Sequence, residues 1–377
     1  MHIAFNGLFL LPPMGGLETY LRELSRALLQ RLDAPRLTLL LTPQGHEKLS
    51  GEDWASEATL VPYPRLGRNG LRAFSELGLF GPVADLRRAD VIHSIALTGP
   101  LYSRAARVLT VADVTWITHP GTNESSATHK LWRAVVPKVA ARSDEVITIS
   151  QAAARDVTTH LGVPADRLTT TLLAGTPLAR ATPTPPAQLR ERLGLGDGPI
   201  VLNVGQKGDH RNLDRLVRSM VAVREAVPGA QLIMPGPPSA EHEATLRRLA
   251  DQAGISAAVH LPGFLPLEDI EGLYAEARAF VLPSLVEGFG LPVLEAMQRG
   301  TPVACTRDTA PSEIAGDAAL TFDPLSESEI AASIVRLLQD DALRGKLTER
   351  GLARAATFTW ARCAEETMAV YERALTR

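Results

Sequence analysis

Short runs of aliphatic and β-branched residues alternate with stretches of helical periodicity along almost the whole chain. The helical spacing of three and four residues is seen, for example, in Leu17, Leu21, Leu24 and Leu28. The predicted strands are residues 2–6, 37–42, 90–94, 107–112 and 145–150 in the first half, and 199–205, 230–236, 258–264, 279–284 and 302–306 in the second. Such alternation is typical of parallel sheets covered by helices on both faces, so the pattern predicts an α/β protein.

A run rich in threonine, proline and glycine separates the two halves of this pattern, "LARATPTPPAQLRERLGLGDGP". Its prolines interrupt helices and cannot join a central strand. We therefore expect a linker over residues 179–198 between a domain at 1–178 and a domain at 199–356, each a doubly wound, Rossmann-like unit. Residues 357–377 continue as a final helical segment.

Charge and cysteine content narrow the class of protein. The 377 residues carry a formal net charge of −3, so no global basic field attracts nucleic acid, and we expect no nucleic-acid partner. The two cysteines, Cys305 and Cys363, are too few for a disulfide framework and have no metal-ligand spacing. They are expected to be reduced core thiols, which fits a cytoplasmic protein.

Membrane association is the next question. The start, "MHIAFNGLFLLPPMGG", lacks the basic region of a signal peptide, and no stretch approaches the roughly twenty apolar residues of a membrane span. Residues 65–88 and 129–142 mix arginine and lysine with large apolar residues. We interpret them as amphipathic helices packed on the sheet, with peripheral contact to anionic lipid or a lipid-linked acceptor as the alternative.

Two glutamates stand out in the stretch "PSLVEGFGLPVLEAMQRG", residues 283–300. Glu287 follows a predicted strand, and Glu295 falls within a helix predicted over 291–299, where Pro292 suits the first turn and Gly300 the C′ position. Ligands of parallel sheets bind beyond the carboxyl ends of the strands, and carboxylates can accept two hydrogen bonds from the vicinal hydroxyls of a sugar. We therefore favour a binding role for both glutamates over the alternative, a structural ion pair.

Two other loops carry features suited to phosphate. Gly15 and Gly16 open the first helix, where free backbone N–H groups suit an anion, although a structural turn is the commoner explanation. Lys207, His210 and Arg211 lie in the loop after strand 199–205, just before a helix that starts near Asn212. This second loop is either an anion site or a solvated loop.

The stretch "PSLVEGFGLPVLEAMQRGTPV" resembles the E-x7-E signature of retaining glycosyltransferase family 4, whose members have the GT-B fold and use nucleotide sugars. The segments "GGLETYLREL", "DVIHS", "VGQKGDHRNLDRLV", "HLPGFLPLEDIEGLYAEARAFVLPS" and "GDAALTFDP" resemble other blocks of that family in the same order. The resemblance implies two Rossmann-like domains facing a cleft, with the acceptor on the N-terminal side, the donor on the C-terminal side, and a last helix that crosses back to the first domain.

The resemblance also implies roles for individual residues. Glu295 would hold the ribose hydroxyls of the donor and Glu287 the transferred sugar. Arg211 would hold the donor phosphates, and Gly15 and Gly16 would face the diphosphate from the other domain. The remaining donor-binding positions that the resemblance implies are Gln206, Lys207, Phe264, Gly288, Phe289, Gly290 and Leu291.

The chain departs from the family pattern at two places. Gln206 stands where many members have arginine, and Lys207 is our candidate to replace that phosphate clamp. In "LTVADVTW", Ala112 stands where members commonly have a histidine beside the transferred sugar, and alanine can neither hydrogen-bond through its side chain nor transfer a proton. His93, Asp113 and His119 are the candidate substitutes; His93 is the first to test, with a structural histidine at a strand end as the alternative.

In the resembled mechanism the diphosphate leaves from the face that the acceptor hydroxyl attacks, so an α-linked donor gives an α-linked product. No D-x-D sequence occurs, and we expect no metal or other cofactor besides the nucleotide-sugar substrate. The expected function is therefore sugar transfer from a nucleotide-diphosphate sugar to a hydroxyl of a glycan, a lipid-linked acceptor or a small molecule. The alternatives are a non-catalytic nucleotide-sugar binder and another GT-B activity, such as a sugar epimerase.

Overall fold

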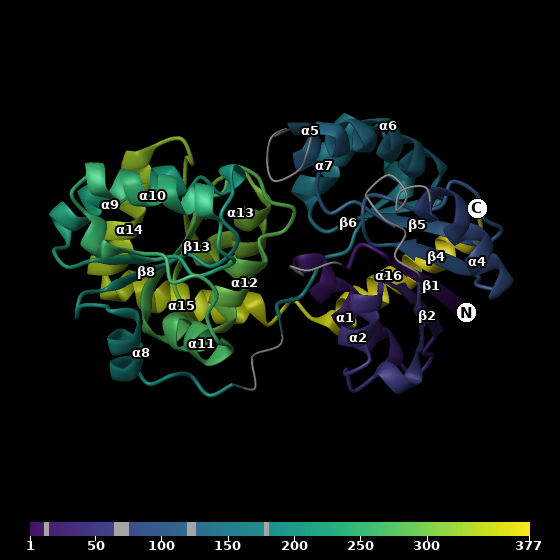
Figure 1. Ribbon diagram of the computed structural model, residues 1–377, viewed down its shortest axis with the longest axis horizontal. Coiled ribbons are helices and arrows are strands. Elements are labelled where there is room, and N and C mark those ends of the chain that lie inside the picture. The colour runs from purple at the N-terminus through teal and green to yellow at the C-terminus, as the bar shows by residue number, and fades with distance from the viewer. Residues whose placement is uncertain (11–14, 64–74, 119–125, 177–180) are drawn as a thin grey trace. The chain divides into compact units, whose positions relative to one another are not determined.

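The computed structural model describes residues 1–10, 15–63, 75–118, 126–176 and 181–377, and this part of the chain divides into two compact units (Figure 1). The N-terminal unit comprises Met1–Ala174 together with Phe358–Arg377, and the C-terminal unit comprises Gly175–Thr357. The sequence pattern placed the corresponding boundaries near 178 and 357. The last helix thus belongs to the N-terminal unit, as the resemblance implied.

The N-terminal unit is built on a seven-stranded parallel sheet with the order β3-β2-β1-β4-β5-β6-β7. Its strands are β1 (His2–Gly7), β2 (Arg36–Leu41), β3 (Thr59–Pro62), β4 (Val91–Ser94), β5 (Ala106–Thr110), β6 (Glu145–Thr148) and β7 (Leu168–Thr170). Its helices are α1 (Gly16–Leu29), α2 (Pro43–Leu49), η1 (Ala55–Glu57), η2 (Ser75–Leu79), α4 (Phe80–Leu86), α5 (Thr115–Thr118), α6 (Ser126–Arg142), α7 (Gln151–Leu161), η3 (Ala165–Arg167) and α16 (Trp360–Leu375).

Helices cover both faces of this sheet because neighbouring strand residues point to opposite sides. Leu109 of β5 packs into a core formed with α6 and α7. Thr110, the next residue, points instead to the side where α1 and α16 pack. Figure 1 shows α16 running beside the strands of this unit, and it packs on β4, β5 and β6, although more than two hundred residues separate it from these three strands in the sequence.

The C-terminal unit repeats the plan with a six-stranded parallel sheet in the order β10-β9-β8-β11-β12-β13. Its strands are β8 (Ile200–Leu202), β9 (Gln231–Ile233), β10 (Val259–His260), β11 (Ala277–Leu282), β12 (Val303–Thr306) and β13 (Ala319–Phe322). Its helices are α8 (Pro186–Leu193), η4 (Asp209–Arg211), α9 (Leu213–Ala226), α10 (Ala240–Gln252), η5 (Ser256–Ala258), α11 (Leu267–Glu276), α12 (Leu291–Gln298), α13 (Ala310–Ala315), η6 (Gly316–Ala318), α14 (Glu327–Gln339) and α15 (Asp341–Ala355). Figure 1 shows α9, α10 and α14 on one side of the sheet and α11, α12 and α15 on the other.

The predicted α/β fold is confirmed, with corrections at the edges and in the linker. The pattern missed β3, β7 and β13, which are short and have few buried residues. The expected linker was too long, because residues 186–193 within it form α8, whose Leu189 is fully buried. Pro186 does not prevent this helix because proline is tolerated in the first turn, where its missing N–H has no helical partner.

The two segments with mixed basic and apolar residues are helical where they are described. Residues 64–74 lie outside the described part of the first segment, and η2 and α4 form its described portion. The second segment forms most of α6. No helix among the described residues is both long and apolar enough to cross a bilayer.

His93 anchors α16 to the first sheet from inside the core. It is fully buried on β4. Hydrogen bonds join its Nδ1 to the Tyr371 hydroxyl of α16 at 2.7 Å and its Nε2 to Thr110 Oγ1 of β5 at 2.7 Å. Burial lowers the pKa of His93 to about 3, so the ring is neutral at physiological pH.

These contacts correct the expectation that His93 takes part in catalysis. Both ring nitrogens already have partners inside the protein, and no part of the side chain is exposed. The environment matches the alternative, a structural histidine at a strand end. His119, another candidate, lies outside the described residues.

We predict that His93→Gln flattens the loss of stability on acidification. The pKa of His93 is about 3 in the folded state and about 6.5 in the unfolded chain. The unfolded state therefore takes up the proton first, and the free energy of unfolding falls as the pH drops from about 6.5 towards about 3. Denaturant titrations at about pH 7 and about pH 5 measure this slope.

The variant should also lose about 1–3 kcal/mol of stability at neutral pH, because it disturbs two buried hydrogen bonds. The matched control is His160→Gln, which changes an exposed histidine on α7 of the same unit. Identical pH slopes in the wild type and His93→Gln would contradict the prediction.

Candidate functional site

The topology of each sheet marks one position where a ligand can enter. In the C-terminal unit β8 lies between β9 and β11, so the connections from β8 and β11 leave the sheet in opposite directions. A parallel sheet opens a crevice beyond the carboxyl ends of its strands at such a switch point. The loop after β8 carries Arg211, and the loop after β11 carries Glu287.

Arg211 and Glu287 meet at this switch point as an ion pair. The Arg211 guanidinium donates to Glu287 Oε1, and Ser284 Oγ donates to the same oxygen at 2.8 Å. The two charged side chains are only 17% and 13% exposed, so each depends on the other to offset its loss of hydration. The Nε of Arg211 is buried and has no hydrogen-bond partner among the described residues.

A main-chain hydrogen bond and the side chain of Asn212 hold the two loops in register. Leu285 N donates to His210 O at 2.8 Å, and Asn212 Nδ2 donates to Pro283 O at 3.1 Å and to Pro324 O at 2.7 Å. Asn212 has a φ of 55°, a left-handed conformation that asparagine tolerates better than most residues. These bonds fix the loop that carries Arg211 against the loop that carries Glu287.

Ser284 and Asn212 are parts of this site that the sequence-based reasoning did not assign. The available signals were weak: a serine at the end of a buried strand, and an asparagine immediately before a helix. Both act through bonds to the partner loop, which local sequence cannot reveal.

The glycines after Glu287 lead into α12. The helix covers residues 291–298, close to the predicted 291–299, and Gly290 serves as its N-cap with a φ of 97°. A Cβ on Gly290 would lie 3.0 Å from the Pro311 ring, so space as well as conformation favours glycine here. Gly288 and Leu291 are partly exposed, whereas Phe289 is buried.

Glu295 lies on α12 and is held by a residue from the segment that enters the unit. Thr176 Oγ1 donates to Glu295 Oε1 at 2.6 Å. Burial raises the pKa of Glu295, while the Thr176 hydroxyl and the positive charge of Arg299 act in the opposite direction. Arg299 is itself engaged by Glu271, so Glu295 is not its primary ion-pair partner.

Three further predicted donor-binding residues are not drawn into this cluster. Lys207 is buried, and its Nζ lies 3.4 Å from Glu243 of α10, in a pocket whose lining includes neither Arg211 nor Glu287. This ion pair explains how a lysine is buried there. The Nζ has no hydrogen-bond partner among the described residues, and the replacement of the missing arginine by Lys207 stays a prediction. Gln206 is exposed, and Phe264 is 75% exposed.

In the N-terminal unit the corresponding switch point lies between β1 and β4. Gly15 is the N-cap of α1, and both Gly15 and Gly16 are exposed. A Cβ on Gly15 would have no heavy atom within 4 Å, so local packing does not explain this glycine.

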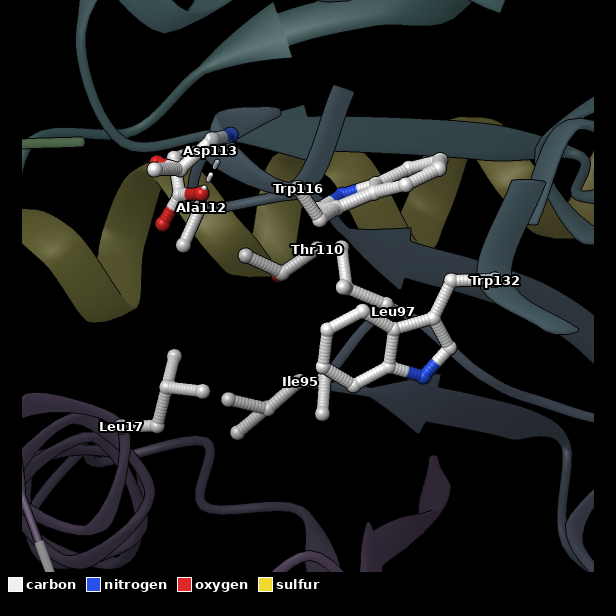
Figure 2. A pocket seen from close by; sticks show the side chains of 10 residues that line it. Leu17, Ile95, Leu97, Thr110, Ala112, Asp113, Trp116 and Trp132 are labelled. Atoms are coloured by element: carbon white, nitrogen blue, oxygen red, sulfur yellow. Dashed lines mark hydrogen bonds between the residues drawn. The ribbon is translucent and has the colours of Figure 1, made fainter. Parts of the chain in front are cut away.

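A pocket of about 190 Å³ opens beside this switch point, at the carboxyl ends of β4 and β5 (Figure 2). Its apolar lining includes Leu17, Ile95, Leu97, Ala112, Trp116 and Trp132. Its polar lining consists of Thr110, Asp113 and Thr115. Asp113 Oδ1 accepts a hydrogen bond from Thr115 N at 2.9 Å, which positions the carboxylate at the start of α5.

Two residues that the sequence singled out line this pocket, Ala112 and Asp113, and Figure 2 shows them side by side. Asp113 thus remains a candidate for chemistry on the acceptor side, whereas His93 lies in the core on the far side of Thr110. No group of three or more His, Cys, Asp or Glu in the described part of the chain is arranged to hold a metal ion.

Comparison with known proteins yields two family matches that follow one another along the chain. Residues 14–171 match the model described as Glycosyltransferase Family 4, and residues 187–354 match the model described as Glycosyl transferases group 1. O-antigen chain mannosyltransferase B of Escherichia coli is 34% identical over 231 residues, which are 60% of each chain. MMP alpha-(1->4)-mannosyltransferase of Mycolicibacterium hassiacum is 31% identical over 64% of this chain and 56% of its own length. The chain thus spans about 60% of the length of these curated relatives.

Solved structures match over nearly the whole length. Sucrose-phosphate synthase from Thermosynechococcus elongatus superposes with a TM-score of 0.75 at 20% identity, covering 98% of both chains. Anabaena Alr3699/HepE in complex with UDP-glucose gives a TM-score of 0.76 at 18% identity and covers 98% of this chain and 99% of that one. These likenesses establish the two-domain Rossmann-like arrangement of the GT-B fold. Together with the two consecutive family matches, they show that the chain belongs to the glycosyltransferase 4 type of GT-B proteins.

Proposed function

We propose that this protein is a retaining glycosyltransferase that moves a sugar from a nucleotide-diphosphate sugar to a hydroxyl acceptor without a metal ion. The observation that carries the proposal is the Arg211–Glu287 ion pair at the switch point of the C-terminal sheet. The pair holds a cation, which we assign to the phosphates, beside a carboxylate, which we assign to the sugar hydroxyls. The names of the relatives, two of them mannosyltransferases, support a hexose as the transferred sugar.

On the donor side, the charges are matched to a leaving diphosphate. Arg211 would lend its unpartnered Nε–H and its charge to the phosphates, where negative charge grows as the bond to the sugar breaks. Glu287 would accept hydrogen bonds from the sugar hydroxyls, with the backbone N–H groups of residues 288–291 nearby. Glu295 would accept hydrogen bonds from the ribose, a role supported by its fixed position against Thr176.

On the acceptor side, Asp113 would accept a hydrogen bond from the attacking hydroxyl. The acceptor oxygen forms the new bond to the anomeric carbon while the bond from that carbon to the diphosphate breaks. As that bond breaks, the hydroxyl proton leaves its hydrogen bond with Asp113 and passes to the departing phosphate oxygen on the same face, and attack from this face retains the configuration. Orientation and charge stabilisation provide the acceleration, so the methyl group of Ala112 does not by itself prevent reaction.

A second candidate function is supported by the same pocket. Ala112 stands where the family commonly has a histidine beside the sugar, and both ring nitrogens of His93 have partners in the core. A non-catalytic nucleotide-sugar binder would keep the donor site and lose turnover. A sugar epimerase, in contrast, would convert the donor in the absence of any acceptor.

Glu287→Gln is expected to abolish transfer while leaving nucleotide affinity within a few-fold of the wild type. The amide keeps the size of the side chain but loses the charge that holds Arg211 and accepts from sugar hydroxyls. Transfer is followed by acceptor-dependent release of nucleoside diphosphate, and affinity by calorimetry. Glu349→Gln, at an exposed position on α15, is the matched control, and undiminished turnover in Glu287→Gln would refute the assigned role.

Glu295→Ala is expected to weaken binding of the nucleoside diphosphate on the order of tenfold or more, because charge-assisted hydrogen bonds to the ribose are lost. Thr176→Val should have a smaller effect of the same sign, since it frees Glu295 without removing it. Thermal shifts with UDP, GDP and ADP first identify the preferred nucleotide. Equal affinity of the wild type and Glu295→Ala would remove Glu295 from the ribose site.

Turnover is expected to continue at its full rate in excess EDTA, and the product is expected to keep the anomeric configuration of the donor. The reason is that a cationic side chain and backbone N–H groups neutralise the leaving group in the proposed mechanism. Activity with and without EDTA and proton NMR of the product measure the two properties. Complete loss of activity that added Mg²⁺ restores would exclude the metal-independent mechanism.

A further inference from the structure

The pocket at the carboxyl ends of β4 and β5 is unusual for a site that would receive only a sugar. A bound hexose buries several hydroxyl groups, and each needs a hydrogen-bond partner to avoid a loss of free energy. Part of the polar lining of this pocket is already engaged: Thr110 Oγ1 bonds to His93, and Asp113 Oδ1 bonds to Thr115 N. The side-chain groups of the lining that remain for a ligand are Asp113 Oδ2, the Thr115 hydroxyl and Trp116 Nε1, which are fewer than the hydroxyls of a hexose.

Two tryptophan rings at a steep angle to one another form part of the apolar lining of the pocket. Trp116 and Trp132 meet edge to face, with ring centroids 6.4 Å apart and planes at 74°. Figure 2 shows Leu97 beside the Trp132 ring, and Leu17 and Ile95 farther from the two tryptophans. Edge-to-face aromatic surfaces of this kind bind flat or aliphatic groups through large contact areas.

The size of the pocket suits one such group. A cavity of about 150 Å³ lined by Leu, Ile and Phe takes up benzene, and this pocket measures about 190 Å³. The small side chain of Ala112 leaves space in the pocket, since a larger side chain at this lining position would take up part of its volume.

One donor group in the lining also lacks a partner. Trp116 is 3% exposed, and its Nε1 has no hydrogen-bond partner among the described residues. An unpaired buried N–H is costly, and an oxygen on a bound ligand would satisfy it. Asp113 provides the complementary acceptor for a hydroxyl.

We propose that this pocket binds an apolar, ring-sized group of the acceptor, such as an aryl aglycone or a short alkyl segment, beside the hydroxyl that receives the sugar. The inference rests on the proposed transferase function for the role of this hydroxyl. In it, Asp113 accepts from the hydroxyl, Trp116 Nε1 donates to a neighbouring oxygen, and Trp132 packs against the apolar group. Ala112 is then a specificity residue whose small size admits that group.

The test compares two ligands that share one sugar, 4-nitrophenyl α-mannoside and methyl α-mannoside, so that only the apolar group differs. Binding is measured by calorimetry without a donor, and transfer is measured separately with the preferred nucleotide sugar. The wild type is expected to bind the aryl ligand about tenfold or more tightly than the methyl ligand. Trp132→Ala, which removes the packing surface, and Ala112→Leu, which fills the space, should each bring this ratio close to one.

Tyr102→Ala is the matched control, because Tyr102 is an exposed aromatic residue of the same unit outside the pocket lining. It should keep the ratio of the wild type. Equal affinity of the wild type for both ligands, or an unchanged ratio in both pocket variants, would overturn the inference. An aryl preference without transfer to either ligand would instead refute the transferase proposal and leave the ligand class of the pocket standing.

Discussion

A parallel sheet directs the carboxyl ends of all its strands to one edge, and this constraint determines where ligands can bind in both units. Side chains far apart in the sequence meet at this edge because the strands that precede them are neighbours. Arg211 and Glu287 are 76 residues apart and meet because β8 and β11 are paired. Leu17 and Asp113 line one pocket because β1, β4 and β5 are consecutive in the other sheet.

The constraint places charged side chains at positions that are partly removed from water. Each of these charges needs a partner of opposite sign to offset its lost hydration. Arg211 and Glu287 compensate each other, and Lys207 is compensated by Glu243. Each pair leaves one donor without a hydrogen-bond partner among the described residues, Arg211 Nε in the first and Lys207 Nζ in the second. The pairs differ in the carboxylate, since Arg211 meets Glu287 of the loop after β11 and Lys207 meets Glu243 of α10. Two cations four residues apart in one loop thus have different partners, which their sequence positions do not distinguish.

Buried elements could be predicted from the sequence, whereas edges and long-range contacts could not. Central parallel strands are apolar on both faces and are recognised as continuous runs, while the partly exposed residues of β3, β7 and β13 give no such run. Helix α8 was concealed by prolines that interrupt a helix in its interior but begin this one. The glutamates of the candidate site could be found because they interrupt an apolar stretch. The burial of His93 could not, because its partner Tyr371 lies 278 residues away.

The return of α16 to the first sheet also affects the order in which the chain can fold. The C-terminal unit is continuous from residue 175 to residue 357, so all its parts are present before α16 has been synthesised. Until α16 has been made, the N-terminal unit lacks the helix that covers one face of β4, β5 and β6. This face of the sheet is then exposed to solvent. Its Phe5–His93–Tyr371 aromatic cluster can close only when the last twenty residues of this unit emerge from the ribosome. Of these two units, the one whose synthesis starts first is therefore completed second, and its uncovered sheet face is exposed to aggregation in the meantime.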